Sequence, residues 1–201
     1  MRKEIFSVPN ILSLVRLALI PVFAWVYLTA GSSGEYYFAA IIVAISGITD
    51  FLDGAIARKF NLITELGKFL DPLADKLTQG TLFLCLAIRH PLMWLLFALW
   101  ALKDGFMAIM GYVLLKAKNT KLEGANWYGK VCTAIIYVAV ILILFFPMYF
   151  APGEIQANVL ILICAGALVL SGILYGIVLV KMWIHHETVK REERKKLKDM
   201  L

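Results

Sequence analysis

Six apolar stretches divide this chain, and each is long enough to cross a hydrocarbon core of roughly 30 Å as a helix. They cover residues 11–28, 36–51, 69–88, 92–115, 131–150 and 157–180. The second is the shortest because its apolar pattern continues through Asp50 towards Arg58. With 61% hydrophobic residues in 201, the chain has more apolar surface than a soluble domain of this size can bury. The sequence therefore predicts an all-α integral membrane protein with six transmembrane helices.

Basic residues are distributed unevenly between the two sides of the predicted helices. If the N-terminus is cytoplasmic, the opposite side has only Arg89. The basic residues on the N-terminal side are Arg58, Lys59, Lys116, Lys118 and Lys121 in the connections, and Lys181, Lys190, Arg191, Arg194, Lys195, Lys196 and Lys198 in the tail. Lysine and arginine concentrate on the cytoplasmic side of membrane proteins. We therefore expect both termini to face the cytoplasm of a bacterial-type plasma membrane.

The chain has no linker long enough to separate two domains, so we expect one membrane domain over residues 1–201. A charged N-terminal segment, residues 1–9, lacks a signal-peptide cleavage pattern, and we expect it to be retained. The net charge of +6 is concentrated in a basic tail, about residues 182–201. A basic segment beside a membrane usually meets anionic lipid headgroups, so membrane lipids rather than nucleic acid are the expected partners. The three cysteines show no ligand spacing and are expected to be small core residues.

Four aspartates lie in the run TDFLDGAIARKFNLITELGKFLDPLADK, between strongly apolar segments. Asp50 and Asp53 are three residues apart and Asp71 and Asp75 are four apart, so each pair shares one helix face. Carboxylates at membrane depth are costly unless they are paired, hydrated or bound to cations. If the two helices pack together, the four carboxylates converge into a site.

The residue types around the aspartates favour a metal-bridged phosphate. Oxygen ligands suit hard cations such as Mg²⁺ or Mn²⁺. Gly54 and Ala57 leave room for a ligand near the backbone, and Arg58 has a planar fork for phosphate oxygens. Two cations in such a site can stabilise the attacking and leaving oxygens of a phosphoryl displacement.

Two other interpretations of the aspartates remain open. The acids can form intramembrane ion pairs with Arg58, Lys68 and Lys76, although four acids outnumber three bases. They can also form the site of a cation-coupled membrane transporter, although a transporter more naturally spreads its acids along a pore.

The run from Asp50 to Asp75 reads D-x-x-D-G-x-x-A-R-x8-G-x3-D-x3-D. It resembles, without a departure, the signature of the CDP-alcohol phosphatidyltransferase family. The resemblance implies an enzyme that transfers a phosphatidyl group from CDP-diacylglycerol to an alcohol and releases CMP. It also implies a six-helix fold with a cytoplasm-facing polar active-site cavity, and a homodimer.

The resemblance assigns roles position by position. Asp50, Asp53, Asp71 and Asp75 are then ligands of a divalent cation, Mg²⁺ or Mn²⁺, with two ions expected. Asp75 is also the expected catalytic general base. The expected nucleotide-binding residues are Asp53, Gly54, Ala57, Arg58 and Gly67.

The N-terminal run VPNILSLVRLALIPV is similar to the P-N-x-L-T/S-x-x-R opening of the branch that makes phosphatidylglycerol phosphate, and of the CMP-forming cardiolipin synthases. That likeness favours glycerol 3-phosphate as acceptor, with cardiolipin synthesis from phosphatidylglycerol, or another acceptor of the family, as the alternative. Lys130, Lys103 and Arg16 are the candidate partners of an anionic acceptor. The chain departs from the glycerophosphate branch at Lys103 and Asp104, where an Arg-Glu or Arg-Asp pair is frequent, and after Lys130, where a second lysine and a glutamine are replaced.

Overall fold

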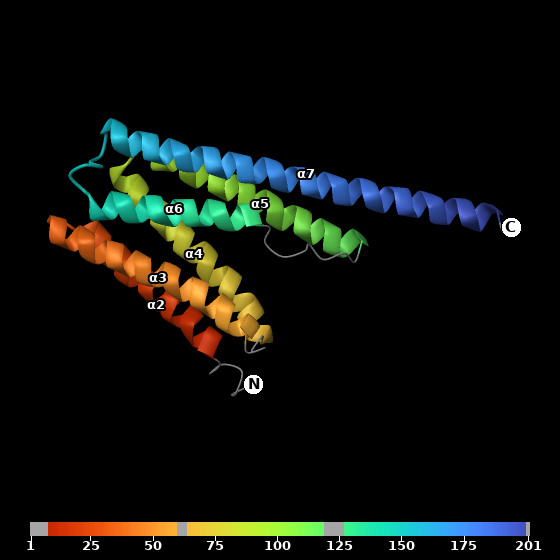
Figure 1. The fold of residues 1–201 in the computed structure, drawn as a ribbon, viewed down its shortest axis with the longest axis horizontal. Coiled ribbons are helices and arrows are strands. Elements are labelled where there is room, and N and C mark those ends of the chain that lie inside the picture. Colours follow the sequence, from red (N-terminus) through yellow and green to blue (C-terminus); the bar gives the residue numbers. More distant parts are fainter. Residues whose placement is uncertain (1–7, 60–63, 119–126, 200–201) are drawn as a thin grey trace.

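The computed structural model describes residues 8–59, 64–118 and 127–199. Within these ranges every regular element is an α-helix, which confirms the prediction of a helical chain. The six helices are α2 (Val8–Thr29), α3 (Ser33–Lys59), α4 (Glu65–Arg89), α5 (Met93–Lys118), α6 (Trp127–Phe145) and α7 (Ile155–Asp199) (Figure 1).

The helices form a closed ring rather than a stack of layers. Each helix makes its extensive contacts with two neighbours, in the order α2, α3, α6, α7, α5, α4 and back to α2. Helix α2 therefore lies between α3 and α4, the two helices that contain the aspartate motif. This position lets side chains of α2 reach both halves of the motif.

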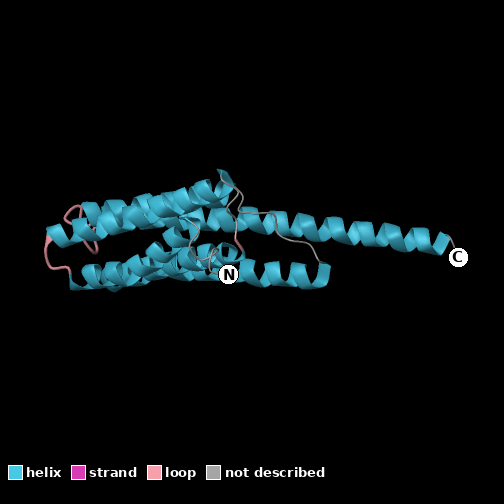
Figure 2. Ribbon diagram, turned by 90° about the horizontal axis from the view of Figure 1, so that it is seen from below, coloured by secondary structure: helices cyan, strands magenta, loops and turns pink. Residues whose placement is uncertain are grey.

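Successive helices run in opposite directions, so the bundle has two distinct ends. The connections from α2 to α3 and from α6 to α7 lie at one end, and the first described residues lie at the other (Figures 1 and 2). The last part of α7 extends beyond the bundle on the side of the N-terminus (Figure 1). The first and last described residues are consequently on the same side of the bundle.

The outer surface of the helices is strongly apolar. Trp25, Phe51 and Leu102 are each more than 70% exposed, at 72%, 73% and 75%. Soluble proteins rarely leave contiguous apolar surface of this kind open to water. Four helical segments of the described chain are long and apolar enough to span a membrane: Val8–Thr29, Ser33–Leu52, Met93–Gly111 and Ile155–Lys181. The protein is an integral membrane protein.

The other two helices depart from an ordinary membrane span for different reasons. The apolar part of α6 is shorter, at Gly129–Phe145. Helix α4 is long enough but has charged residues along its first half, including Lys68, Asp71, Asp75 and Lys76. Six complete membrane crossings therefore remain a prediction. Helix α4, whose composition differs most from that of an ordinary membrane span, contains Asp71 and Asp75 of the aspartate motif.

One expected boundary is wrong. Helix α6 ends at Phe145 and not at residue 150. Pro147 explains the difference, because proline lacks the N–H that a helix interior needs and disfavours a helical residue before it. The basic tail continues α7, whose backbone remains helical without a break to Asp199.

The core between the helices is apolar, and all three cysteines lie in it. Cys85, Cys132 and Cys164 are buried and free, which confirms the expectation that they are small core residues.

Arg89 of α4 connects three helices at the end of the bundle that contains the α2–α3 connection, through contacts with α2, α3 and the residues between them. Its guanidinium donates to the carbonyl of Ala30 at 2.8 Å and to the hydroxyl of Tyr36, and it lies over the rings of Tyr27 and Tyr36. Because Asp75 and Arg89 are 14 residues apart on α4, about 21 Å separates them along the helix axis. Arg89 therefore belongs to the packing of this end and not to the aspartate site.

We predict that positions 32 and 152 face outward, and that position 118 and the tail face the cytoplasm, because basic residues concentrate at that end. The measurement is single-cysteine labelling on intact cells, in a background that lacks Cys85, Cys132 and Cys164. An impermeant maleimide should label cysteines at 32 and 152 only. Labelling at 118 before the membrane is opened would reverse the orientation.

Candidate active site

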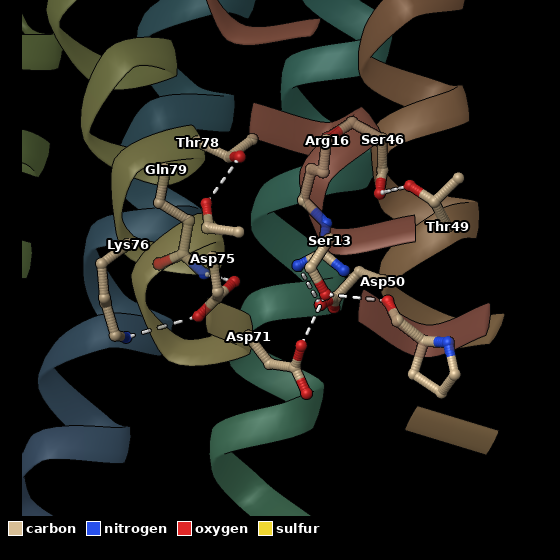
Figure 3. Close-up of polar contacts among 12 residues, drawn as sticks. Ser13, Arg16, Ser46, Thr49, Asp50, Asp71, Asp75, Lys76, Thr78 and Gln79 are labelled. Carbon is tan, nitrogen blue, oxygen red and sulfur yellow. Dashed lines mark hydrogen bonds and ion pairs between the residues drawn. The ribbon is translucent and has the colours of Figure 1, made fainter. Parts of the chain in front are cut away.

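One face of α2 contacts both halves of the aspartate motif. Ser13 and Arg16 are three residues apart and so project from the same side of that helix. The Ser13 hydroxyl donates to Asp71 Oδ1 of α4 at 2.5 Å, and Arg16 Nη1 lies 2.5 Å from Asp50 Oδ1 of α3 (Figure 3). Helix α2 thereby connects two carboxylates that are far apart in the sequence.

Asp75 belongs to the same group, one turn after Asp71 on α4 (Figure 3). It lies close enough to Asp50 and Arg16 to interact electrostatically with both. Gln79 Nε2 donates to Asp75 Oδ1 at 2.8 Å, and Lys76 Nζ lies 3.6 Å from Oδ2. The three motif aspartates whose side chains are described, Asp50, Asp71 and Asp75, therefore lie near the face of α2 that contains Ser13 and Arg16.

Arg16 explains how these acids can lie near one another inside a membrane protein. Its side chain has no solvent-exposed surface, whereas Asp50 is 39% exposed. A buried guanidinium is costly unless an anion meets it, and neighbouring carboxylates repel one another unless a cation offsets them. The carboxylates therefore offset the free-energy cost of burying the Arg16 guanidinium, and the guanidinium reduces the repulsion between the carboxylates. Arg16 is part of the structure of the site.

Close packing of α2 against the start of α4 fixes the position of Asp71. Thr64 caps α4, because its hydroxyl accepts from the Gly67 N–H at 2.9 Å and donates to Asn10 Oδ1 at 3.1 Å. A Cβ at position 67 would lie 2.7 Å from Asn10 Oδ1. The contact explains why glycine is needed at this position without invoking a nucleotide. A nucleotide-binding role for Gly67 remains a prediction.

The predicted acceptor residues lie in three different settings. Arg16 is fully buried against Asp50. Lys103 Nζ lies 3.4 Å from Asp104 Oδ1, and Lys76 Nζ lies 2.5 Å from Asp104 Oδ2, so these two lysines share the Asp104 carboxylate. Lys130 is exposed near the start of α6. No described contact joins the three into one subsite.

Part of the predicted nucleotide site lies outside the described side chains. Asp53, Gly54, Ala57 and Arg58 belong to the last two turns of α3, whose backbone is helical. Their side chains are outside the described residues, so the convergence of all four aspartates is untested.

The described side chains alone do not form a metal-binding cluster. Among them, no three histidine, cysteine, aspartate or glutamate side chains lie close enough to hold one ion. The donor chemistry nevertheless fits a hard divalent cation, since Asp50, Asp71 and Asp75 offer carboxylate oxygens and Ser13 a hydroxyl. Asp50, Asp71 and Asp75 would supply carboxylate oxygens to such a cation, together with Asp53, whose side chain is outside the described residues.

A cavity of about 480 Å³ lies elsewhere, between α2 and α3 around Trp25, Glu35 and Phe38. These residues are at the other end of the two helices from Arg16 and Asp50. The polar cavity expected at the aspartates is therefore still a prediction.

Sequence reasoning missed Gln79 and Trp100. Gln79 is four residues after Asp75, a spacing that places it on the same helix face and could have been noticed. Trp100 belongs to α5, and its indole donates to Gln79 Oε1 at 2.8 Å. No pattern in the sequence connects Trp100, which is 21 residues after Gln79, with an aspartate site.

Comparison with known proteins places most of the chain in one family. The sequence model described as CDP-alcohol phosphatidyltransferase matches residues 6–183. This range contains every described contact of the aspartate site.

Curated relatives fall into two groups by name. The chain is 35% identical over 133 residues to a cardiolipin synthase (CMP-forming) from Streptomyces coelicolor, covering 65% of this chain and 61% of that protein. It is 34% identical over 147 residues to a CDP-diacylglycerol–glycerol-3-phosphate 3-phosphatidyltransferase from Bacillus subtilis, covering 67% and 75%. A protein of that second name from Rickettsia bellii is 42% identical over 80 residues, covering 40% of this chain and 44% of that protein.

We predict that Arg16→Met lowers the melting temperature in detergent and that Mg²⁺ restores more of the loss than it adds to the wild type. Breaking a buried ion pair typically costs about 3–5 kcal/mol, and a smaller loss is expected here because water reaches Asp50. A divalent cation can replace the missing positive charge among the carboxylates. The measurement is thermal unfolding with and without Mg²⁺.

Arg89→Met is the matched control, because Arg89 contacts carbonyls and tyrosines and no described carboxylate. It should lower the melting temperature with no extra recovery in Mg²⁺. An identical Mg²⁺ response in Arg16→Met and the wild type would contradict the role given to Arg16.

Proposed function

Because the chain belongs to the CDP-alcohol phosphatidyltransferase family, we propose that it transfers a phosphatidyl group from CDP-diacylglycerol to glycerol 3-phosphate. The products are phosphatidylglycerol phosphate and CMP. The family membership agrees with the resemblance found in the aspartate motif. It disfavours the alternative of a cation-coupled transporter.

One observation supports the proposal most strongly: carboxylates from α3 and α4 gather around a single face of α2 (Figure 3). Packing alone does not require a third acid beside the Arg16–Asp50 ion pair, and Lys76, the lysine next to that acid, is shared with Asp104. Asp75 is that third acid, and it interacts with both Asp50 and Arg16. A concentration of negative charge of this kind suits the binding of cations that neutralise a pyrophosphate.

The proposed reaction balances with the residues of this site. The acceptor hydroxyl oxygen attacks the phosphatidyl phosphorus, and the bond from that phosphorus to the oxygen it shares with CMP breaks. Asp75 accepts the hydroxyl proton, and CMP leaves with the electron pair of the broken bond. When bound, Mg²⁺ or Mn²⁺, with two ions proposed, would neutralise charge on the pyrophosphate oxygens. Asp50, Asp53, Asp71 and Asp75 would hold these ions, and Gly54, Ala57, Arg58 and Gly67 would line the nucleotide with Asp53.

Two acceptors are candidates for this reaction. The similarity to the Bacillus subtilis protein and the run from Pro9 to Arg16 support glycerol 3-phosphate. The similarity to the Streptomyces coelicolor protein supports the second candidate, cardiolipin synthesis from phosphatidylglycerol. In either reaction Lys130 and Lys103 are proposed to meet acceptor phosphate.

The proposed membrane topology follows from the apolar helix lengths and the distribution of basic residues. Six helices would cross a bacterial-type plasma membrane, with the aspartates and both termini on the cytoplasmic side. The protein would act as a homodimer, in line with the family resemblance.

We expect purified protein to release CMP from CDP-diacylglycerol only when Mg²⁺ or Mn²⁺ is present, and fastest with glycerol 3-phosphate. The assay compares glycerol 3-phosphate, phosphatidylglycerol, serine, inositol phosphate and no acceptor. Asp75→Asn should lose about 10²- to 10⁴-fold in turnover, because the amide cannot accept the proton. Full turnover in chelator would reject the metal-dependent mechanism. Faster release with phosphatidylglycerol would reassign the protein to cardiolipin synthesis.

Lys130→Ala should raise the Michaelis constant for glycerol 3-phosphate far more than that for CDP-diacylglycerol. Only the acceptor would lose a charge partner. The measurement is initial rates with each substrate varied in turn, and Lys181→Ala is a control on an exposed lysine of α7. Equal constants in Lys130→Ala and the wild type would leave Lys130 as a membrane anchor.

A further inference from the structure

A buried glutamine connects the proposed general base to a tryptophan on a different helix. Gln79 is 4% exposed and lies one turn after Asp75 on α4. Its Nε2 donates to Asp75 Oδ1 at 2.8 Å, and its Oε1 accepts from Trp100 Nε1 of α5 at 2.8 Å. The amide therefore uses both of its ends, one towards the site and one away from it.

The chemistry of the two partners permits only one orientation of this amide. An indole N–H can only donate and an ionised carboxylate can only accept. If the Gln79 amide turned over, its oxygen would face the Asp75 carboxylate and its NH₂ would face the indole N–H. Both hydrogen bonds would be lost inside the protein, where unsatisfied polar groups are costly.

Packing holds the indole itself in place. Its ring lies edge-on to Phe83, with centroids 5.7 Å apart, and tilted against Phe97 at 5.8 Å. Gly80 lets the indole approach α4, because a Cβ there would lie 3.3 Å from Trp100 Cη2. An indole confined on three sides has little freedom to move its N–H away from Gln79.

We infer that Gln79 and Trp100 are positioning residues for Asp75, a role that rests on the proposed function. Trp100 fixes the Gln79 amide, and the amide holds Oδ1 of Asp75. Oδ2, which lies 3.6 Å from Lys76 Nζ, is then the oxygen available to a cation or to the acceptor proton. Partners of this kind orient the groups that bind metals, and losing one typically costs about 10- to 100-fold in metal affinity or activity.

The test is a double-mutant cycle on CMP release. Gln79→Met keeps the shape of the side chain and removes its donor, and Trp100→Phe keeps an aromatic ring and removes the indole N–H. Gln79→Met should lower kcat roughly 10- to 100-fold, with the Michaelis constant for CDP-diacylglycerol nearly unchanged. Trp100→Phe should cost less. It should cost nothing further in the Gln79→Met background, because the indole acts only through the amide.

Thr78→Val is the matched control. Thr78 is the buried neighbour of Gln79, and its hydroxyl donates to the Ala74 carbonyl at 2.7 Å rather than to a group of the site. It removes one buried hydroxyl from the same turn of α4 and should leave kcat within about twofold of the wild type, in line with its lack of contact with Asp75.

A second measurement separates this inference from the proposed function. Mn²⁺ titration followed by electron paramagnetic resonance should show affinity about tenfold weaker in Gln79→Met than in the wild type, with Thr78→Val unchanged. If wild-type protein released no CMP while Gln79→Met still weakened Mn²⁺ binding, the function would fail and the positioning role would stand. Additive losses in the cycle, or a lower melting temperature with unchanged Mn²⁺ affinity and kcat, would overturn the positioning role.

Discussion

The ion pair between Arg16 and Asp50 is the interaction on which the rest of the site depends. Arg16 is fully buried in a bundle whose outer surface is apolar, so its charge must be met by anions within the protein. Asp50 is the anion that pairs with Arg16, and Asp75 lies near enough to interact electrostatically with both residues. The positive charge of Arg16 offsets the repulsion between these carboxylates, so they can lie close together.

The order of the helices in the ring places the Arg16–Asp50 pair close to both halves of the aspartate motif. Because α2 packs between α3 and α4, Arg16 and Ser13 reach both halves of the aspartate motif. Helix α5 packs on the other side of α4 and supplies Trp100, which reaches Asp75 through Gln79. Helix α4 is thus held from both sides at the level of its acids. A fixed arrangement of carboxylates is what electrostatic stabilisation of a phosphoryl transfer requires.

The sequence predicted the features that depend on local chemistry. Apolar lengths predicted the helices, and the spacing of the aspartates predicted which of them share a face. The early end of α6 was also readable, because Pro147 cannot continue a helix. The order of helices around the ring was not readable, and so neither the bond of Arg16 to Asp50 nor that of Trp100 to Gln79 was expected. Such contacts depend on packing between segments, for which a single sequence contains no direct signal.

We propose that carboxylates from α3 and α4 form one cation site beside α2. Anomalous diffraction from crystals grown with Mn²⁺ and a cytidine nucleotide tests it most directly, since manganese is located by its own scattering. We expect anomalous peaks between Asp50 and Asp53 on one side and Asp71 and Asp75 on the other. Peaks confined to other parts of the protein, or none at Mn²⁺ concentrations that support CMP release, would contradict it.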